Sequence, residues 1–145
     1  MRLFKTSEEY RNIILQCCNY LREICLNTQE GYKKPHGISG ANLAIPFNIV
    51  GATRNRNEDN EYCQIMINPI ILSYSNNEVI TQSNCGSLTL ENSINVKRSS
   101  TIAVEYYDEN GNIHYDTFNR KSSGFSIQHE VDHNNGILII DREIK

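Results

Sequence analysis

Two kinds of segment are missing from the 145-residue sequence: an apolar run long enough to cross a bilayer, and a run of lysine and arginine. The first absence excludes a membrane-spanning helix. The second, together with a net charge of -3, gives no indication of a nucleic-acid partner. No internal repeat or low-complexity linker interrupts the sequence, so we expect a single domain over residues 1–145.

A secretion signal is also missing, because residues 1–6 lead directly into acidic and polar residues. Five cysteines are an odd number, and their spacing is irregular. Both features predict a cytoplasmic protein with free thiols. Hydrophobic residues make up 39% of the chain and charged residues 21%, which indicates a globular protein rather than a disordered one.

A His-Glu-x-x-His sequence lies near the C-terminus, at His129, Glu130 and His133. Positions i and i+4 of a helix share one face, so both imidazoles can reach one metal ion. Glu130 would then stand beside water bound to that ion and could accept its proton. The simpler alternative is a polar helix face with two solvated histidines. A catalytic metal needs about three protein ligands, and Cys85, in a turn of small residues, can supply the third.

The segment around these histidines, residues 128–138, resembles the third motif of peptide deformylases, Gln-His-Glu-x-Asp-His-x-x-Gly. Cys85 falls where that family carries its metal-binding cysteine, although its neighbours match the family pattern Glu-Gly-Cys-Leu-Ser poorly. Residues 37–44 are similar to the first family motif, with several departures. The three blocks agree in order and spacing, and the resemblance extends from about Tyr10 to Arg142.

This resemblance implies a hydrolase that removes the N-formyl group from the initiator methionine of nascent peptides, at the ribosome. It implies that Cys85, His129 and His133 hold one divalent metal ion, Fe(II) in the cell, with Zn(II) or Ni(II) as substitutes. Glu130 would take the proton of the attacking water and give it to the leaving amine. Two alternatives remain: hydrolysis of another amide or formyl compound, and metal binding without turnover. The intact Glu130 favours an enzyme.

The family's oxyanion donor, a glutamine of the first motif, is missing from this sequence. The corresponding position is Ala44 in one register and Phe47 in another, and neither side chain can donate a hydrogen bond. We expect the metal, the backbone N–H of Gly86 and the side-chain amide of Asn42 to take this role.

The resemblance also implies four residues that contact the substrate. Gly40 belongs to the first motif, and Phe125 and Ser126 precede the histidine motif, where the family lines its substrate pocket. Arg98 matches a family arginine near the substrate, one residue further from the cysteine than usual.

The predicted fold class is α+β, with an N-terminal helix, antiparallel strands and hairpins, and a short C-terminal catalytic helix. The N-terminal helix begins at Ser7, a suitable N-cap, and ends before Asn27. Cys18 lies off its predicted buried stripe, which consists of Tyr10, Ile13, Ile14, Cys17, Leu21, Ile24 and Cys25.

Turn-forming residues divide the rest of the chain. Asn110-Gly111, between two β-branched and aromatic runs, predicts a hairpin of residues 102–107 and 113–118. Pro69 is expected to end the strand that begins near Cys63, or to mark an edge strand. The catalytic helix is expected to begin near Gly124 and to end at Gly136.

Overall fold

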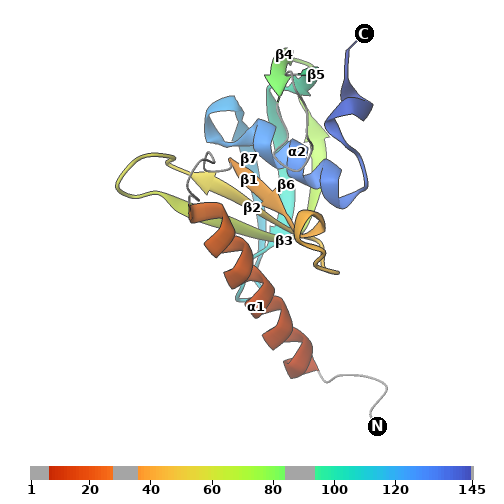
Figure 1. The fold of residues 1–145 in the computed structure, drawn as a ribbon. Coiled ribbons are helices and arrows are strands. Elements are labelled where there is room, and N and C mark those ends of the chain that lie inside the picture. The colour runs from red at the N-terminus through yellow and green to blue at the C-terminus, as the bar shows by residue number, and fades with distance from the viewer. Residues whose placement is uncertain (1–6, 28–35, 84–93, 145) are drawn as a thin grey trace.

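The computed structural model describes residues 7–27, 36–83 and 94–144 (Figure 1). Its helices are α1 (Ser7–Leu26) and α2 (Gly124–Asn134), and its strands are β1 (Gly37–Ser39), β2 (Ile49–Arg54), β3 (Tyr62–Tyr74), β4 (Glu78–Ser83), β5 (Ile94–Ser99), β6 (Thr101–Tyr107) and β7 (Ile113–Asn119). Three short 3-10 helices are η1 (Gly40–Leu43), η2 (Arg120–Ser122) and η3 (Ile139–Arg142). These elements confirm the predicted α+β class.

One antiparallel sheet of five strands, in the order β1-β2-β3-β6-β7, separates the two helices. Neighbouring residues of a strand point to opposite faces, so Ile49 packs in the core beneath α1 and Val50 in the core beneath α2. The core beneath α2 contains Val50, Ala52, Met66, Ile102, Val104, Tyr106, Phe118, Ile127 and Val131. The core beneath α1 contains Cys18, Leu21, Cys25, Ile38, Ile49, Cys63 and Ile65.

The helix α1 has the predicted bounds, but its buried face differs from the predicted stripe. Cys18 is fully buried together with Leu21 and Cys25, whereas Tyr10 is 43% exposed and Cys17 is only partly buried. The prediction that Cys18 lies off the stripe is therefore wrong. The stripe formed by all apolar residues of the helix lies toward Cys17. The sheet instead contacts the side on which positions 18, 21 and 25 recur at spacings of three and four.

The strand β3 continues through Pro69, so the prediction that Pro69 ends the strand is wrong. Among the described strands, β3 has β2 beside it only as far as Ile67 and β6 alone beside it beyond that residue, which agrees with the alternative of an edge position. Its register against β6 shifts between Ile67 and Ile70, and Asn68 has a φ of 51°. This bulge removes Pro69 from the regular ladder, where its missing N–H would leave a hydrogen bond unmade.

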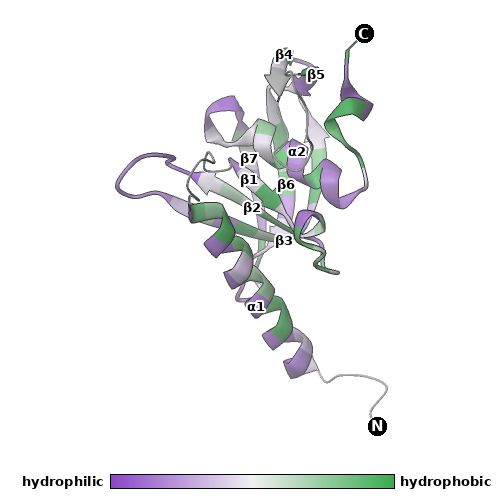
Figure 2. Cartoon of the chain, viewed as in Figure 1, coloured by the Kyte–Doolittle hydropathy of each residue, from purple (hydrophilic) through white to green (hydrophobic). Residues whose placement is uncertain are grey.

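The predicted hairpin is confirmed as β6 and β7. The loop between β2 and β3 is hydrophilic (Figure 2). Gly111 has a φ of 85° at the turn, where residues with a side chain are strained. Asp108 accepts hydrogen bonds from the backbone N–H groups of Asn110 and Asn112. His114 lies 2.7 Å from the Asp108 carboxylate and stacks on Tyr106, so it is part of the hairpin's structure.

The short helix α2 begins at Gly124 and is followed by Gly136, whose φ is 78°, as predicted. A Cβ at Gly124 would come within 2.7 Å of the Asn119 carbonyl oxygen, so glycine is needed for the close approach of α2 to the end of β7. None of the helices in residues 7–27 and 94–144 is long and apolar enough to span a bilayer.

Candidate metal centre and active site

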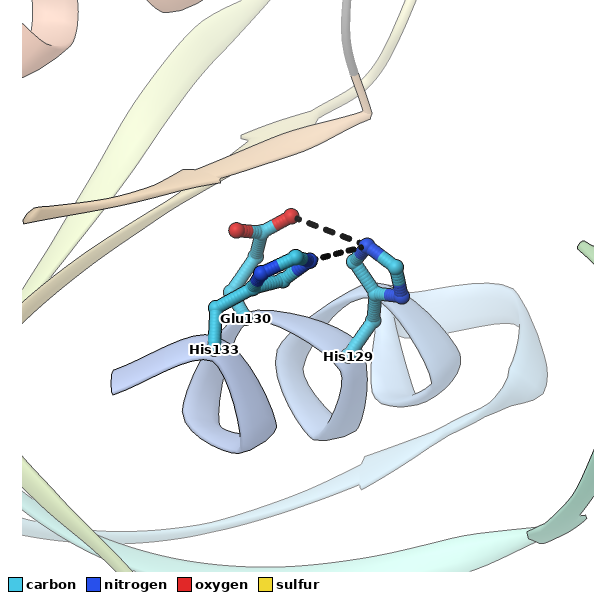
Figure 3. A group of neighbouring side chains, drawn as sticks. All are labelled: His129, Glu130 and His133. Atoms are coloured by element: carbon cyan, nitrogen blue, oxygen red, sulfur yellow. Dashed lines mark hydrogen bonds and ion pairs between the residues drawn. The ribbon is translucent and has the colours of Figure 1, made fainter. Parts of the chain in front are cut away.

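The candidate centre consists of His129, Glu130 and His133, three side chains of α2 that face the same region (Figure 3). The opposite side of α2 carries Ile127 and Val131, which are 0% and 8% exposed and pack in the core beneath this helix. Burial of that apolar pair fixes the rotation of α2 about its axis. The i, i+4 spacing then places both imidazoles on one face, as the sequence predicted.

The two imidazole rings converge. The Nε2 atoms of His129 and His133 are 2.8 Å apart, and the ring planes make an angle of 70°. One potential ligand atom from each residue of the group, Glu130 included, lies within 4.8 Å of the others. A metal about 2.0–2.1 Å from each nitrogen, with tetrahedral angles, needs the nitrogens about 3.3 Å apart. A separation of the rings by about half an ångström would therefore accommodate a divalent ion.

The centre is enclosed on most sides. Glu130 is 4% exposed and His133 6%, while the His129 side chain retains 17% exposure. Electrostatic interactions are stronger in such a site than in water, because bulk solvent screens them less. The Glu130 Oε1 atom lies 3.8 Å from the His129 Nε2 atom, on the side of the ring that a ligand of the histidines would occupy.

A glycine on the facing strand allows this packing. A Cβ on Gly37 of β1 would lie 3.1 Å from the Glu130 Cγ atom, closer than ordinary contacts. Gly37 is the first residue of the segment that is similar to the first family motif. The structure identifies its neighbour as Glu130 of the His-Glu-x-x-His sequence.

Comparisons with known proteins identify the family of the chain. The family model for polypeptide deformylase matches residues 2–145. The chain belongs to the peptide deformylase family. It is 30% identical over 146 residues to a peptide deformylase of Karelsulcia muelleri, an alignment that covers 89% of this chain and 76% of that protein.

Solved structures show the same fold. A class I type b peptide deformylase from Acinetobacter baumannii, crystallised with Met-Ala-Ser, matches with a TM-score of 0.77 and 24% identity over 95% of this chain and 86% of that one. A probable peptide deformylase from Synechococcus phage S-SSM7 matches with a TM-score of 0.73 and 20% identity, over 97% of this chain and 88% of that one. Family membership identifies the chain as a metal-dependent hydrolase that removes the N-formyl group from nascent peptides.

In this deformylase, Arg98 forms a buried ion pair with Asp132 of the histidine motif. Arg98 is 5% exposed, and its Nη1 atom donates to Asp132 Oδ2 at 2.7 Å. Arg142 of η3 donates to both Asp132 oxygens, at 3.2 and 3.0 Å, and these bonds raise the pKa of Arg142. The structure thus gives Arg98 a partner on α2, which sequence reasoning missed. Substrate contact by Arg98 stays a prediction.

Gln128 makes a second link between α2 and β5 of the deformylase. Its Nε2 atom donates to the carbonyl oxygen of Ser99 at 2.9 Å, and its Oε1 atom accepts from the Ser99 backbone N–H at 3.3 Å. Gln128 and Asp132 therefore hold two consecutive residues of β5. In the β4–β5 pairing, Arg98 and Ser99 lie opposite Val79 and Glu78 at the start of β4, the strand whose last residue precedes Cys85 by two positions. Cys85 and Gly86 themselves lie outside the described residues.

The predicted oxyanion residue Asn42 lies in η1, which is attached to the end of α2. The side chain of Asn134, next to His133, accepts from the Ala41 N–H at 3.1 Å and donates to the Ile49 carbonyl oxygen at 3.1 Å. Asn42 is exposed. Gly40 is buried, and a Cβ there would meet the Phe47 carbonyl oxygen at 2.8 Å, so its packing partner is the backbone that follows η1.

Phe125 and Ser126 occupy the first turn of α2, before His129. The Arg120 guanidinium lies 5.9 Å from the centre of the Phe125 ring, and both Phe125 and Ser126 are partly exposed. Ser126 also faces β1, since its Cβ would be 3.6 Å from a Cβ on Gly37. These residues and the catalytic motif therefore share one helix, beside β1.

Proposed function

We propose that this deformylase holds one divalent metal ion through His129, His133 and Cys85, and that Glu130 moves the protons of formyl hydrolysis. One observation carries the proposal: two imidazole nitrogens 2.8 Å apart, with a carboxylate oxygen 3.8 Å from one of them, on a buried helix face. Two imidazoles and a thiolate suit several borderline metals. We propose Fe(II) as the metal in the cell, with Zn(II) or Ni(II) as substitutes.

When bound, the metal acts as a Lewis acid that lowers the pKa of water toward neutrality. Glu130 accepts the proton of the water whose oxygen attacks the formyl carbon. It then donates that proton to the nitrogen as the carbon–nitrogen bond breaks, which yields formate and a free amino terminus. The low exposure of Glu130 supports this role, because a carboxylate shielded from bulk water delivers its proton to the bound substrate.

Stabilisation of the oxyanion is assigned to the Gly86 backbone N–H and the Asn42 amide. The link between η1 and α2 through Asn134 supports Asn42, since it attaches this turn to the residue after His133. A donor stabilises the oxyanion when its nitrogen lies about 3 Å from the oxygen that becomes negatively charged.

For the substrate, we propose a formylmethionyl peptide that contacts Gly40, Phe125, Ser126 and Arg98. The relative from Acinetobacter baumannii that was crystallised with Met-Ala-Ser supports a methionyl peptide as the ligand class. The ion pair of Arg98 with Asp132 would connect this contact to α2. We place the reaction on nascent chains at the ribosome, in the cytoplasm, within a single domain over residues 1–145.

The test is a formate assay with a matched substrate. The protein is purified without oxygen and loaded with Fe(II), its metal content is measured, and formyl-Met-Ala-Ser is compared with acetyl-Met-Ala-Ser. We expect one metal ion per chain, release of formate in equal amount to free amine, and no reaction of the acetyl peptide. If the fully metal-loaded protein releases no formate, the proposed substrate is wrong, and another amide or formyl compound is favoured as the substrate.

A further inference from the structure

Two thiols from distant parts of the chain meet in the core beneath α1. Cys25, on α1, is 0% exposed, and Cys63, on β3, is 5% exposed. The Cys25 sulfur lies 3.0 Å from the Thr53 hydroxyl oxygen. Thr53 of β2 is the direct cross-strand partner of Cys63, and directly opposed residues of antiparallel strands place their side chains on the same face. The fold thus brings the two sulfurs together, and they are hydrogen-bonded.

A glycine makes room for this pair. A Cβ on Gly51 of β2 would lie 2.8 Å from the Cys63 sulfur, a distance that real side chains do not show. The sulfur of Cys63 therefore occupies space that only glycine leaves open. This packing limits the positions available to the Cys63 sulfur.

The hydrogen bonds make the two thiols unequal. Bonds from the Cys63 and Thr53 side chains lower the pKa of the Cys25 thiol, despite its burial. The same bond and burial raise the pKa of Cys63, since the pair shares a proton. Cys18, two turns before Cys25 on the same helix, lacks such donors, and burial raises its pKa to about 12. A thiolate is the reactive form of cysteine, so Cys25 is the nucleophile of the pair.

We propose that Cys25 and Cys63 form a modification site that hydrogen peroxide converts to a disulfide between α1 and β3. The Cys25 thiolate attacks one peroxide oxygen, the O–O bond breaks, and Cys25 becomes a sulfenic acid while hydroxide leaves. The Cys63 sulfur then attacks the Cys25 sulfur and displaces the hydroxyl group as water, with the Cys63 proton. In total, two thiols and one peroxide give one disulfide and two waters.

Formation of the bond requires the sulfurs to approach from hydrogen-bond contact to about 2.05 Å. The helix α1 contacts the sheet mainly through side chains, so a small movement of the helix can close this distance. The inference is independent of the metal centre, because neither Cys25 nor Cys63 belongs to the proposed ligand set. Its product is a covalent connection between the N-terminal helix and the central sheet.

The test is a disulfide map of the native, metal-loaded protein after treatment with hydrogen peroxide and alkylation of the remaining thiols. Cleavage after glutamate separates the cysteines: Cys25 falls in residues 24–30, Cys63 in residues 62–78, and Cys85 in residues 79–91. We expect residues 24–30 and 62–78 to be recovered as a linked pair that has lost two hydrogen atoms and that reduction separates. Recovery of both as alkylated thiols, while Cys85 is oxidised, would overturn the proposal.

Two variants and one condition sharpen the test. Cys17→Ser, on the same helix, should leave the linked peptides unchanged. Cys63→Ser should leave Cys25 as a sulfenic acid that dimedone traps, because the second thiol is missing. Treatment in urea should give mixed pairs that include Cys17, Cys18 and Cys85. A linked pair that forms only in urea would show that the native fold does not direct it, and would overturn the proposal.

Discussion

At the scale of single residues, the site depends on how closely Glu130 can approach the sheet. Gly37 has no Cβ at the point where one would lie 3.1 Å from the Glu130 Cγ atom. The carboxylate is thereby held 3.8 Å from the His129 ring nitrogen and almost hidden from solvent. A short, fixed distance between a proton carrier and the reacting water contributes to catalysis mainly through orientation.

The substitution Glu130→Gln should leave metal binding intact and lower turnover by about a hundred- to ten-thousand-fold, because it removes a proton carrier and no ligand. The measurement is formate release at equal metal content, determined by elemental analysis. Loss of metal in this variant would make Glu130 a ligand and would contradict the assigned role.

Cys85→Ser should strongly reduce the metal content, since a hydroxyl is a much weaker ligand than a thiolate for these ions. Cys17→Ser is the matched control, because Cys17 is partly exposed on α1, away from the centre. Both variants are dialysed against the same chelator series. Equal retention of metal would mean that the third ligand lies elsewhere.

The absence of the family's glutamine predicts a specific role for Asn42. If its amide stabilises the oxyanion, Asn42→Ala should reduce turnover of formyl-Met-Ala-Ser about a hundred- to thousand-fold at unchanged metal content. Asn48→Ala serves as the control, because Asn48 is also exposed and its side-chain oxygen accepts a hydrogen bond from Asn134. An active parent with an unaffected Asn42→Ala variant would leave the oxyanion to other donors.

At the scale of elements, α2 is attached to β5 by two neighbouring contacts. Gln128 bonds to the backbone of Ser99, and Asp132 pairs with Arg98. Residues i and i+4 of the helix thus hold consecutive residues of the strand. Because β5 is paired with β4, this contact connects the catalytic helix to the hairpin that leads to Cys85.

Removal of Asp132 should destabilise the protein strongly. Asp132→Ala leaves the Arg98 guanidinium buried without its carboxylate, and breaking a buried pair in this way costs about 3–5 kcal/mol. Arg142→Ala, which removes a partner that is 44% exposed, should cost less than about 1 kcal/mol. Urea unfolding of both variants measures the difference. Similar losses would show that the outer arginine contributes as much as the buried one.

Elements defined by local chemistry were predictable, and those set by long-range pairing were not. The Asn110-Gly111 hairpin and the two histidines at i, i+4 depend on neighbouring residues, so the sequence was sufficient to predict them. The burial of Cys18 depends on which side of α1 meets the sheet, and the ion pair of Arg98 with Asp132 joins residues 34 positions apart. Neither is determined by local sequence.

At the scale of the whole molecule, one sheet separates two hydrophobic cores, and each core packs a different helix against the sheet. The core beneath α1 attaches the N-terminal helix, and the core beneath α2 orients the helix that carries the histidine motif. Leu21 and Ile127 are both 0% exposed and lie in these two cores, on opposite sides of the sheet. Substitution of each residue therefore compares how the two cores contribute to stability and to catalysis.

Leu21→Ala and Ile127→Ala should each destabilise the protein by about 2–5 kcal/mol, through lost burial and a cavity, and should lower the melting temperature by roughly 5–15 °C. Tyr20→Ala, at a position 48% exposed on α1, should change it little.

Their effects on kcat/KM should differ, when measured at a temperature at which all three variants are folded. Ile127 lies directly before Gln128 and His129 on α2, so a cavity there permits a displacement of the catalytic side chains, and displacements near 1 Å reduce turnover about a hundred-fold. Leu21→Ala should keep the kcat/KM of the parent, because the sheet lies between its cavity and α2. An equal loss in both variants would show that packing of α1 against the sheet also sets the geometry of the active site.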